Sequence, residues 1–250
     1  MMSQNLDYIA DTSAGAIRDL GVARALLDDI RNGTRGPTLR IYQPQPTVAF
    51  GARDRFADGF PQATQAARAH GFTPALRTLG GRAAAYHLGS LVLDHLEPAS
   101  TLYGKTQERF TQFGDLYASA LRTLGVDARI GEIPGEYCPG EFSVNAAGRI
   151  KIIGTAQRVT NKGWLFSSSV IVTDPQPIRA CLTDVEAALG VDWDPQTGGA
   201  LSELHPGITV EDVKDAFLAA YATEWDIRET ALTSDVTQAS RAYDERHRVE

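Results

Sequence analysis

The spacing of hydrophobic positions predicts several amphipathic helices. Residues 15–32 carry apolar side chains at the three- and four-residue intervals of one helix face. Residues 105–124 repeat this pattern over a longer stretch, which ends at Gly125. Residues 60–70, 177–189 and 209–225 are also predicted to be helical. Thr209, followed by Asp212 three residues later, forms an imperfect capping box at the start of the last helix.

Short apolar runs between these helices predict strands. They cover residues 38–43, 47–50, 73–78, 90–95, 127–130, 142–145, 150–153 and 164–172. An Ala147-Gly148 turn joins two of the later strands. Strands cluster early and centrally, helices flank them, and a strict strand–helix alternation is missing. The pattern therefore predicts an α+β fold with a mixed or antiparallel sheet flanked by helices.

The same pattern suggests one main domain over residues 15–230, in which residues 175–230 are mostly helical. Residues 1–14 are interpreted as a flexible N-terminus and residues 231–250 as a charged tail, which is expected to be frayed from Arg241 to Glu250. The net charge of −7 does not favour binding to nucleic acid or to an anionic membrane. The chain lacks an apolar run of about 20 residues and a signal-peptide pattern, so a cytoplasmic location is expected.

Two cysteines, Cys138 and Cys181, raise the question of chemistry. Their separation matches no metal-ligand spacing, so no metal site is predicted. Cys181 lies in a predicted helix and is interpreted as a packing residue. Cys138 lies in a loop between Tyr137 and Pro139, where a reactive thiolate could be presented. A small buried side chain is the alternative interpretation of Cys138.

Lys151 lies on a predicted strand close to this loop, across the Ala147-Gly148 turn. An ammonium group there could favour the Cys138 thiolate or polarise a carbonyl under attack. An exposed strand lysine is the alternative. The run of apolar and small residues that follows, residues 152–156, argues for burial and against that alternative.

A third segment, residues 77–89, contains Gly80-Gly81 followed by three alanines. Glycines let a backbone approach a ligand and expose its N–H groups, and the alanines would leave room along a groove. The alternative is an ordinary glycine hairpin with a small-residue strand. His87, taken alone, could be a buried and hydrogen-bonded histidine.

Together these segments resemble the catalytic domain shared by lipoate–protein ligases, octanoyltransferases and biotin–protein ligases. Gly80, Gly81 and Gly89 match the glycine segment of that superfamily, and residues 148–158 match its lysine segment. The resemblance covers roughly residues 15–225. The sequence YCPGEFSV, residues 137–144, is most similar to the octanoyl-[GcvH]:protein N-octanoyltransferases.

The resemblance implies which residues form the site. It makes Cys138 the acyl-accepting nucleophile and Lys151 the second catalytic residue. It assigns substrate contacts to Arg77, Gly80, Gly81, Arg82, Tyr86, His87, Gly154, Thr155, Ala156 and Gln157. Thr78 replaces a second arginine of the family, and Arg82 replaces a small or apolar residue. Tyr86 takes the place of the ligase histidine, and one extra residue, Ile150, precedes the lysine.

The function implied is transfer of an octanoyl or lipoyl group onto a lysine of lipoyl carrier domains. The glycine cleavage H protein and E2 subunits are the expected partners, a Cys138 thioester is the expected intermediate, and transfer is expected to require no cofactor. Two alternatives remain, an ATP- and Mg-dependent lipoate–protein ligase and a non-catalytic acyl or cofactor binding protein. Replacing Lys151 by alanine is expected to abolish transfer and leave the fold intact.

Overall fold

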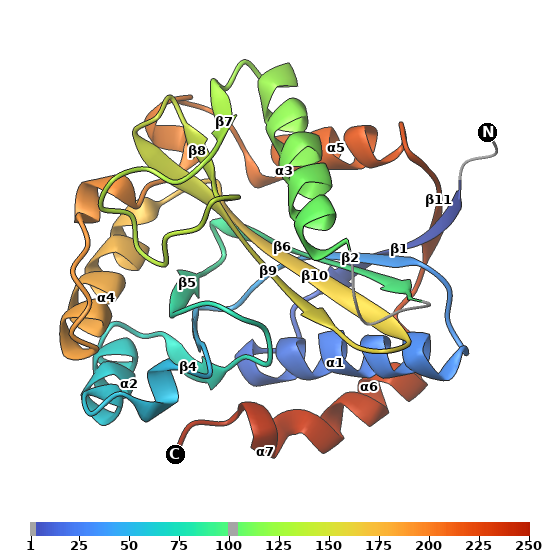
Figure 1. Ribbon diagram of the computed structural model, residues 1–250, viewed down its shortest axis with the longest axis horizontal. Coiled ribbons are helices and arrows are strands. Elements are labelled where there is room, and N and C mark those ends of the chain that lie inside the picture. The colour runs from blue at the N-terminus through green and yellow to red at the C-terminus, as the bar shows by residue number, and fades with distance from the viewer. Residues whose placement is uncertain (1–3, 100–104) are drawn as a thin grey trace.

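A computed structural model describes residues 4–99 and 105–250 (Figure 1). It confirms the α+β class. Within those residues, eight strands form a mixed sheet in the order β11-β1-β2-β6-β10-β9-β8-β7. The strands are β1 (Gln4–Thr12), β2 (Thr38–Gln43), β6 (Ser90–Pro98), β7 (Ala128–Ile130), β8 (Val144–Ala146), β9 (Ile150–Val159), β10 (Gly163–Ile171) and β11 (Trp225–Thr230). Within this sheet, the parallel pairs among the described strands are those of β1 with β2 on one side and with β11 on the other.

The long central strands β6, β10 and β9 form an antiparallel ladder. Ser167 of β10 lies opposite Ala156 of β9 on one side and Asp94 of β6 on the other. The β8–β9 hairpin turns at Ala147 and Gly148, which both have left-handed backbones with φ of 57° and 67°. This turn confirms the predicted hairpin and places Lys151 near the start of β9.

Helices cover both faces of the large sheet (Figure 1). They are α1 (Ala16–Asn32), α6 (Ser234–Ser240) and α7 (Asp244–His247) on one face, and α3 (Thr106–Thr123) and α5 (Val210–Tyr221) on the other. On the first face, Leu26 and Ile30 of α1 pack with Leu165 of β10. On the second, Phe113 and Phe217 pack with sheet residues. The predicted Thr209–Asp212 capping box is confirmed.

A smaller sheet in the order β4-β3-β5 lies beside the large one. Its strands are β3 (Thr47–Phe50), β4 (Thr73–Leu76) and β5 (Ala84–Tyr86), and it packs against α2 (Phe60–Ala69) and α4 (Pro175–Ala188). The remaining short turns are 3-10 helices η1 (Asp54–Phe56), η2 (Pro195–Thr197), η3 (Leu201–Glu203) and η4 (Arg241–Tyr243). Within the described ranges, no helix is both long and apolar enough to cross a membrane.

Three predictions about the ends of the domain are wrong. Residues 4–12, interpreted as part of a flexible N-terminus, form β1, because Leu6 and Ile9 are completely buried between sheet and helices; residues 1–3 lie outside the described residues. The C-terminal segment is folded rather than frayed, since Arg18 of α1 pairs with Asp244 and His247 is buried. The last predicted helix ends at Tyr221, and Trp225 begins β11.

Candidate active site

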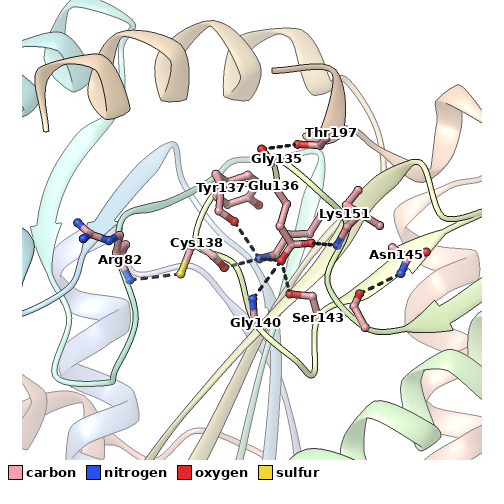
Figure 2. Close-up of polar contacts among 12 residues, drawn as sticks. Arg82, Gly135, Glu136, Tyr137, Cys138, Gly140, Ser143, Asn145, Lys151 and Thr197 are labelled. Carbon is pink, nitrogen blue, oxygen red and sulfur yellow. Dashed lines mark hydrogen bonds and ion pairs between the residues drawn. The ribbon is translucent and has the colours of Figure 1, made fainter. Parts of the chain in front are cut away.

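Cys138 lies in the loop between β7 and β8, with a left-handed backbone at φ 43°. Non-glycine residues adopt this conformation uncommonly, and such positions cluster at functional sites. The side chain is half-buried rather than enclosed in the core. Its sulfur accepts a hydrogen bond from the backbone N–H of Arg82 at 3.2 Å (Figure 2). The interpretation of Cys138 as a fully buried packing residue is therefore wrong.

Lys151 holds the loop that carries Cys138. Its ammonium donates to the carbonyl oxygens of Tyr137 at 3.0 Å and Cys138 at 2.7 Å, and to Glu136 Oε1 at 3.0 Å (Figure 2). It also lies 4.9 Å from the centre of the Tyr137 ring. These three hydrogen bonds account for the three N–H donors of an ammonium. Lys151 is only 3% exposed, so the interpretation as an idle surface charge is wrong.

Glu136 is the anion at the centre of this arrangement, and sequence reasoning did not identify it. Besides Lys151, its carboxylate accepts from the backbone N–H groups of Ile133 and Gly140 and from the Ser143 hydroxyl. Four donors on one buried carboxylate fix the shape of the loop on both sides of Cys138. The sequence signal for this role was weak, because an acidic residue in a glycine-rich loop ordinarily faces solvent.

The Gly80-Gly81 turn approaches Cys138 closely. Gly81 has φ 94°, and a Cβ there would lie 2.5 Å from Arg77 Nη2 and 3.3 Å from Cys138 Sγ. The positive φ favours glycine at residue 81, and a Cβ there would displace the end of the Arg77 side chain and crowd the Cys138 sulfur. Arg77 Nη2 donates to the Arg82 carbonyl at 2.5 Å, and Arg158 Nη1 donates to the Thr78 carbonyl at 2.9 Å. Two arginines thus secure the turn that faces the sulfur.

A cavity of about 350 Å³ lies between this turn, the Cys138 loop and strands β9 and β10. Its lining includes Cys138 and Lys151, and eight of the ten predicted substrate-contacting residues: Arg77, Gly80, Gly81, Tyr86, Gly154, Thr155, Ala156 and Gln157. Apolar walls come from Leu20, Ala23, Leu79, Val92, Phe110, Phe142 and Leu165, and polar lining comes from Asp94 and Ser167–Ser169. The two predicted segments therefore converge on one hollow.

Two predicted contact residues lie outside that lining. Arg82 contributes its backbone N–H to the sulfur, while its side chain is 42% exposed and turned away from Cys138 (Figure 2). His87 is 7% exposed, accepts the Gly89 N–H at Nδ1 and donates from Nε2 to the Asp174 carbonyl at 2.8 Å. Both ring nitrogens are engaged in holding a turn, so the structure supports the buried, hydrogen-bonded interpretation of His87.

Two further polar residues, Gln157 and Asp94, lie on the cavity lining. Gln157 accepts from Arg109 and donates to the Thr106 carbonyl, which ties β9 to the start of α3. Asp94, on the cavity lining, is buried, and burial raises the pKa of its carboxyl against the opposing effect of Arg40. The described residues contain no cluster of histidine, cysteine and acidic side chains that could hold a metal.

Cys181 is less accessible than Cys138. It is completely buried on α4, and burial, together with the charge of Asp184, raises the pKa of its thiol to about 12. A thiol of that pKa is protonated at neutral pH and therefore a poor nucleophile. This supports the interpretation of Cys181 as a packing residue.

The fold is that of a lipoate-protein ligase. A crystal structure of lipoate-protein ligase A bound with ATP superimposes with a TM-score of 0.76 at 20% identity, covering 98% of this chain and 95% of that one. Residues 17–222 match the lipoyl protein ligase A/B catalytic domain, and the chain belongs to this family. The resemblance inferred from residues 77–89 and 135–158 is thereby confirmed.

Two curated relatives carry the same name, octanoyl-[GcvH]:protein N-octanoyltransferase. The protein from Geobacillus kaustophilus is 26% identical over 165 residues, which cover 66% of this chain and 58% of that protein. The protein from Exiguobacterium sibiricum is 26% identical over 193 residues, covering 72% of this chain and 69% of that protein. The chain thus matches less than two thirds of the length of the Geobacillus protein.

Proposed function

We propose that this chain is an acyltransferase that moves an octanoyl or lipoyl group onto a lysine of lipoyl carrier domains through a thioester on Cys138. The proposal depends on one observation. The half-buried Cys138 sulfur lines a 350 Å³ cavity and accepts a backbone N–H hydrogen bond at 3.2 Å. The names of the curated relatives support an octanoyl group and a glycine cleavage H protein, while E2 subunits stay a prediction.

In the first half of the reaction, the Cys138 thiolate attacks the amide carbonyl of an acylated carrier lysine. The C–S bond forms, the C–N bond breaks, and the departing lysine nitrogen takes up the proton that the thiol released. In the second half, the amine of another carrier lysine attacks the thioester carbonyl. The new C–N bond forms, the C–S bond breaks, and the proton that the amine loses goes to the departing Cys138 sulfur, which restores the thiol. Covalent catalysis replaces one difficult exchange by two easier ones.

The geometry supplies positive potential where negative charge develops. The Lys151 ammonium lines the cavity and bonds the Cys138 carbonyl, and the Arg82 N–H faces the sulfur. The three N–H donors of Lys151 are engaged by the loop, so the ammonium acts on a tetrahedral oxyanion through its fixed charge, while the Arg82 N–H stabilises the thiolate. Lys151 therefore has two roles in the proposal: it positions the nucleophile, and it places a charge beside the reacting carbonyl.

The cavity suits a medium-length acyl chain. Burying a methylene contributes about 0.8 kcal/mol, so six methylenes against the apolar walls contribute on the order of 5 kcal/mol. That is enough to hold an octanoyl group while its carrier docks. No cofactor enters either half-reaction as proposed. A cytoplasmic location stays a prediction from the sequence.

The test is an intact-mass experiment without ATP. Purified protein is mixed with an octanoylated carrier and an unmodified lipoyl domain, and adducts are followed over time. We expect an octanoyl adduct on the wild type and on a Cys181→Ser control, and none on Cys138→Ser. Transfer that requires ATP and survives Cys138→Ser would instead identify a ligase. Bound acyl ligand without transfer would identify a binding protein.

A further inference from the structure

The Gly80-Gly81 turn forms part of the rim of the cavity that contains the Cys138 sulfur. Both glycines are exposed and line the cavity, and a Cβ at residue 81 would lie 3.3 Å from the sulfur. On the Cys138 loop, Glu141 is exposed and lines the same cavity. A carrier domain that brings its acylated lysine to Cys138 therefore contacts residues beside the turn and beside the loop.

Residues 51–56 lie directly behind the turn. A Cβ at Gly51 would lie 1.8 Å from the Gly81 carbonyl oxygen, so the two backbones are in contact. The chain then enters η1, where the buried Asp54 accepts the Gly51 N–H at 2.9 Å and lies 3.7 Å from Arg82 Nη1. The Asp54 carboxylate thus ties η1 to the turn, and the residues beside Asp54 are exposed at the surface next to the rim.

These exposed residues combine two positive charges with an aromatic ring. Arg53 and Arg55 are exposed, and neither forms an ion pair within residues 4–99 and 105–250, whereas Arg82 approaches Asp54. Phe56 is 83% exposed, a large apolar surface to leave in water. Arginine and aromatic residues are enriched at protein–protein interfaces, so this combination indicates a contact surface.

A second hollow, of about 900 Å³, continues this surface towards the end of the chain. Arg55, Arg246 and Arg248 line it beside the aromatic ring of Phe60. Two acidic side chains line it as well, but one of them, Glu245, lies 3.7 Å from Arg248. Arg246 is exposed and forms no ion pair in the part of the chain that the structure describes. The hollow therefore adds positive charge to the surface that begins at η1.

We propose that Arg53, Arg55, Phe56 and Arg246, the basic patch, form the docking surface for an acidic face of the carrier domain beside its acylated lysine. The proposal rests on the proposed function, which requires a carrier at the cavity rim. The chain as a whole has a net charge of −7, so an acidic protein is attracted only where positive charges gather. Glu141 repels the same acidic face from the opposite rim, and the two charges together orient the carrier.

Steady-state transfer from an octanoylated glycine cleavage H protein tests this surface. Arg53→Glu/Arg55→Glu should raise the KM for the carrier about tenfold and leave kcat within about twofold, because the basic patch contacts the carrier and not the reacting atoms. Phe56→Ser should raise KM about fivefold through loss of apolar contact. Lys162→Glu, which reverses a charge at the exposed turn between β9 and β10, is the matched control and should keep the wild-type KM.

Salt separates a charged contact from a steric one. Raising the ionic strength from about 0.02 M to about 0.3 M should raise the wild-type KM for the carrier, because screening weakens the attraction. Arg53→Glu/Arg55→Glu should lose this dependence, whereas Phe56→Ser and Lys162→Glu should keep it. A KM that rises equally with salt in the wild type and in the double variant would contradict an electrostatic role of the arginines.

Alkylation of Cys138 by iodoacetamide checks the thiol separately, since this reagent needs no carrier. The alkylation rates and thermal stabilities of the Arg53, Arg55 and Phe56 variants should match those of the wild type, because the three side chains are exposed. Slower alkylation in these variants would overturn the proposal, since the residues would then act on the thiol and not on the carrier.

Titration of the octanoylated carrier onto Cys138→Ser measures docking without turnover. Adding Arg53→Glu/Arg55→Glu to this variant should weaken the Kd about tenfold. An unchanged Kd, or an equal loss caused by Lys162→Glu, would overturn the proposal; stabilisation of the wild type by inorganic phosphate alone would then identify a small-anion site in its place. The proposed function fails by a different result, acyl transfer that survives Cys138→Ser, so the two failures are distinguishable.

Discussion

The Lys151–Glu136 pair allows the structural and chemical roles of one lysine to be separated. Lys151→Met removes the ammonium but keeps most of the volume of its buried stem. Glu136 would then be left as a buried carboxylate with its backbone and Ser143 donors but without its cation. The Tyr137 and Cys138 carbonyls would lose their donor as well.

The expected loss follows from these contacts. Removing one partner of a buried ion pair costs about 3–5 kcal/mol, because the other charge stays buried and unpaired. The three donors that remain on Glu136 place the estimate near the lower end, about 3 kcal/mol, although the two carbonyls left unsatisfied add to it. The structure thus changes the expectation from sequence, which was an intact fold after loss of Lys151.

Urea unfolding at pH 7, followed by circular dichroism, measures this loss. Lys162→Met, at an exposed turn between β9 and β10, is the matched control and should stay within about 0.5 kcal/mol of the wild type. The double variant Lys151→Met/Glu136→Gln should regain part of the stability, because no buried charge remains, yet should not transfer acyl groups. If Lys151→Met unfolds at the same urea concentration as Lys162→Met, the buried-pair reasoning is refuted.

Three further outcomes are expected. Gly81→Ala introduces a side chain at φ 94° and displaces the Arg77 guanidinium, so it should lower both the thermal stability and the alkylation rate of Cys138. Gly36→Ala, at an open position, should change neither, and equal effects of the two substitutions would contradict the argument. Burial raises the pKa of Glu186 from 4.5 to about 7, so the folded state holds a proton that the unfolded state releases. As pH rises from 4.5 to 7, the free energy of unfolding of the wild type should therefore fall by about 3 kcal/mol relative to that of Glu186→Gln. Urea stabilities of the two proteins that run parallel across this pH range would contradict this prediction. Cys181, with a pKa of about 12, should stay unlabelled by iodoacetamide at pH 8 until urea unfolds the chain, and labelling of the native protein would show that it is accessible.

Local patterns in the sequence were sufficient for most helices and strands. Residues 38–43 and 47–50 form strands with the predicted bounds, and the predicted helix 15–32 differs from α1 by one residue. The strands β1 and β11 were missed: β11 pairs with β1 from the other end of the chain, and β1 pairs with β11 and with β2, which follows the intervening helix α1. A strand that becomes stable only through non-local parallel pairing leaves little signal in its own residues.

At the candidate site too, residues in short sequence motifs could be predicted, and residues brought in from distant segments could not. Cys138, Lys151 and the Gly80-Gly81 turn could be identified because each belongs to a short motif. Glu136 and the Asp54 partner of Arg82 could not. Asp54 reaches the turn from a segment 28 residues before Arg82, and no periodicity connects the two. The catalytic assignments themselves stay predictions until Cys138 and Lys151 variants are assayed.

The last helix has a consequence for ligand binding. His247 of α7 donates from Nδ1 to the Leu76 carbonyl and forms part of the cavity lining, although it lies 88 residues beyond the end of β9 at Val159. Filling that hollow and docking the C-terminal helix are therefore thermodynamically linked. A molecule that fits the hollow should slow amide hydrogen exchange in α7, so the far end of the chain becomes a reporter for occupancy at the thiol.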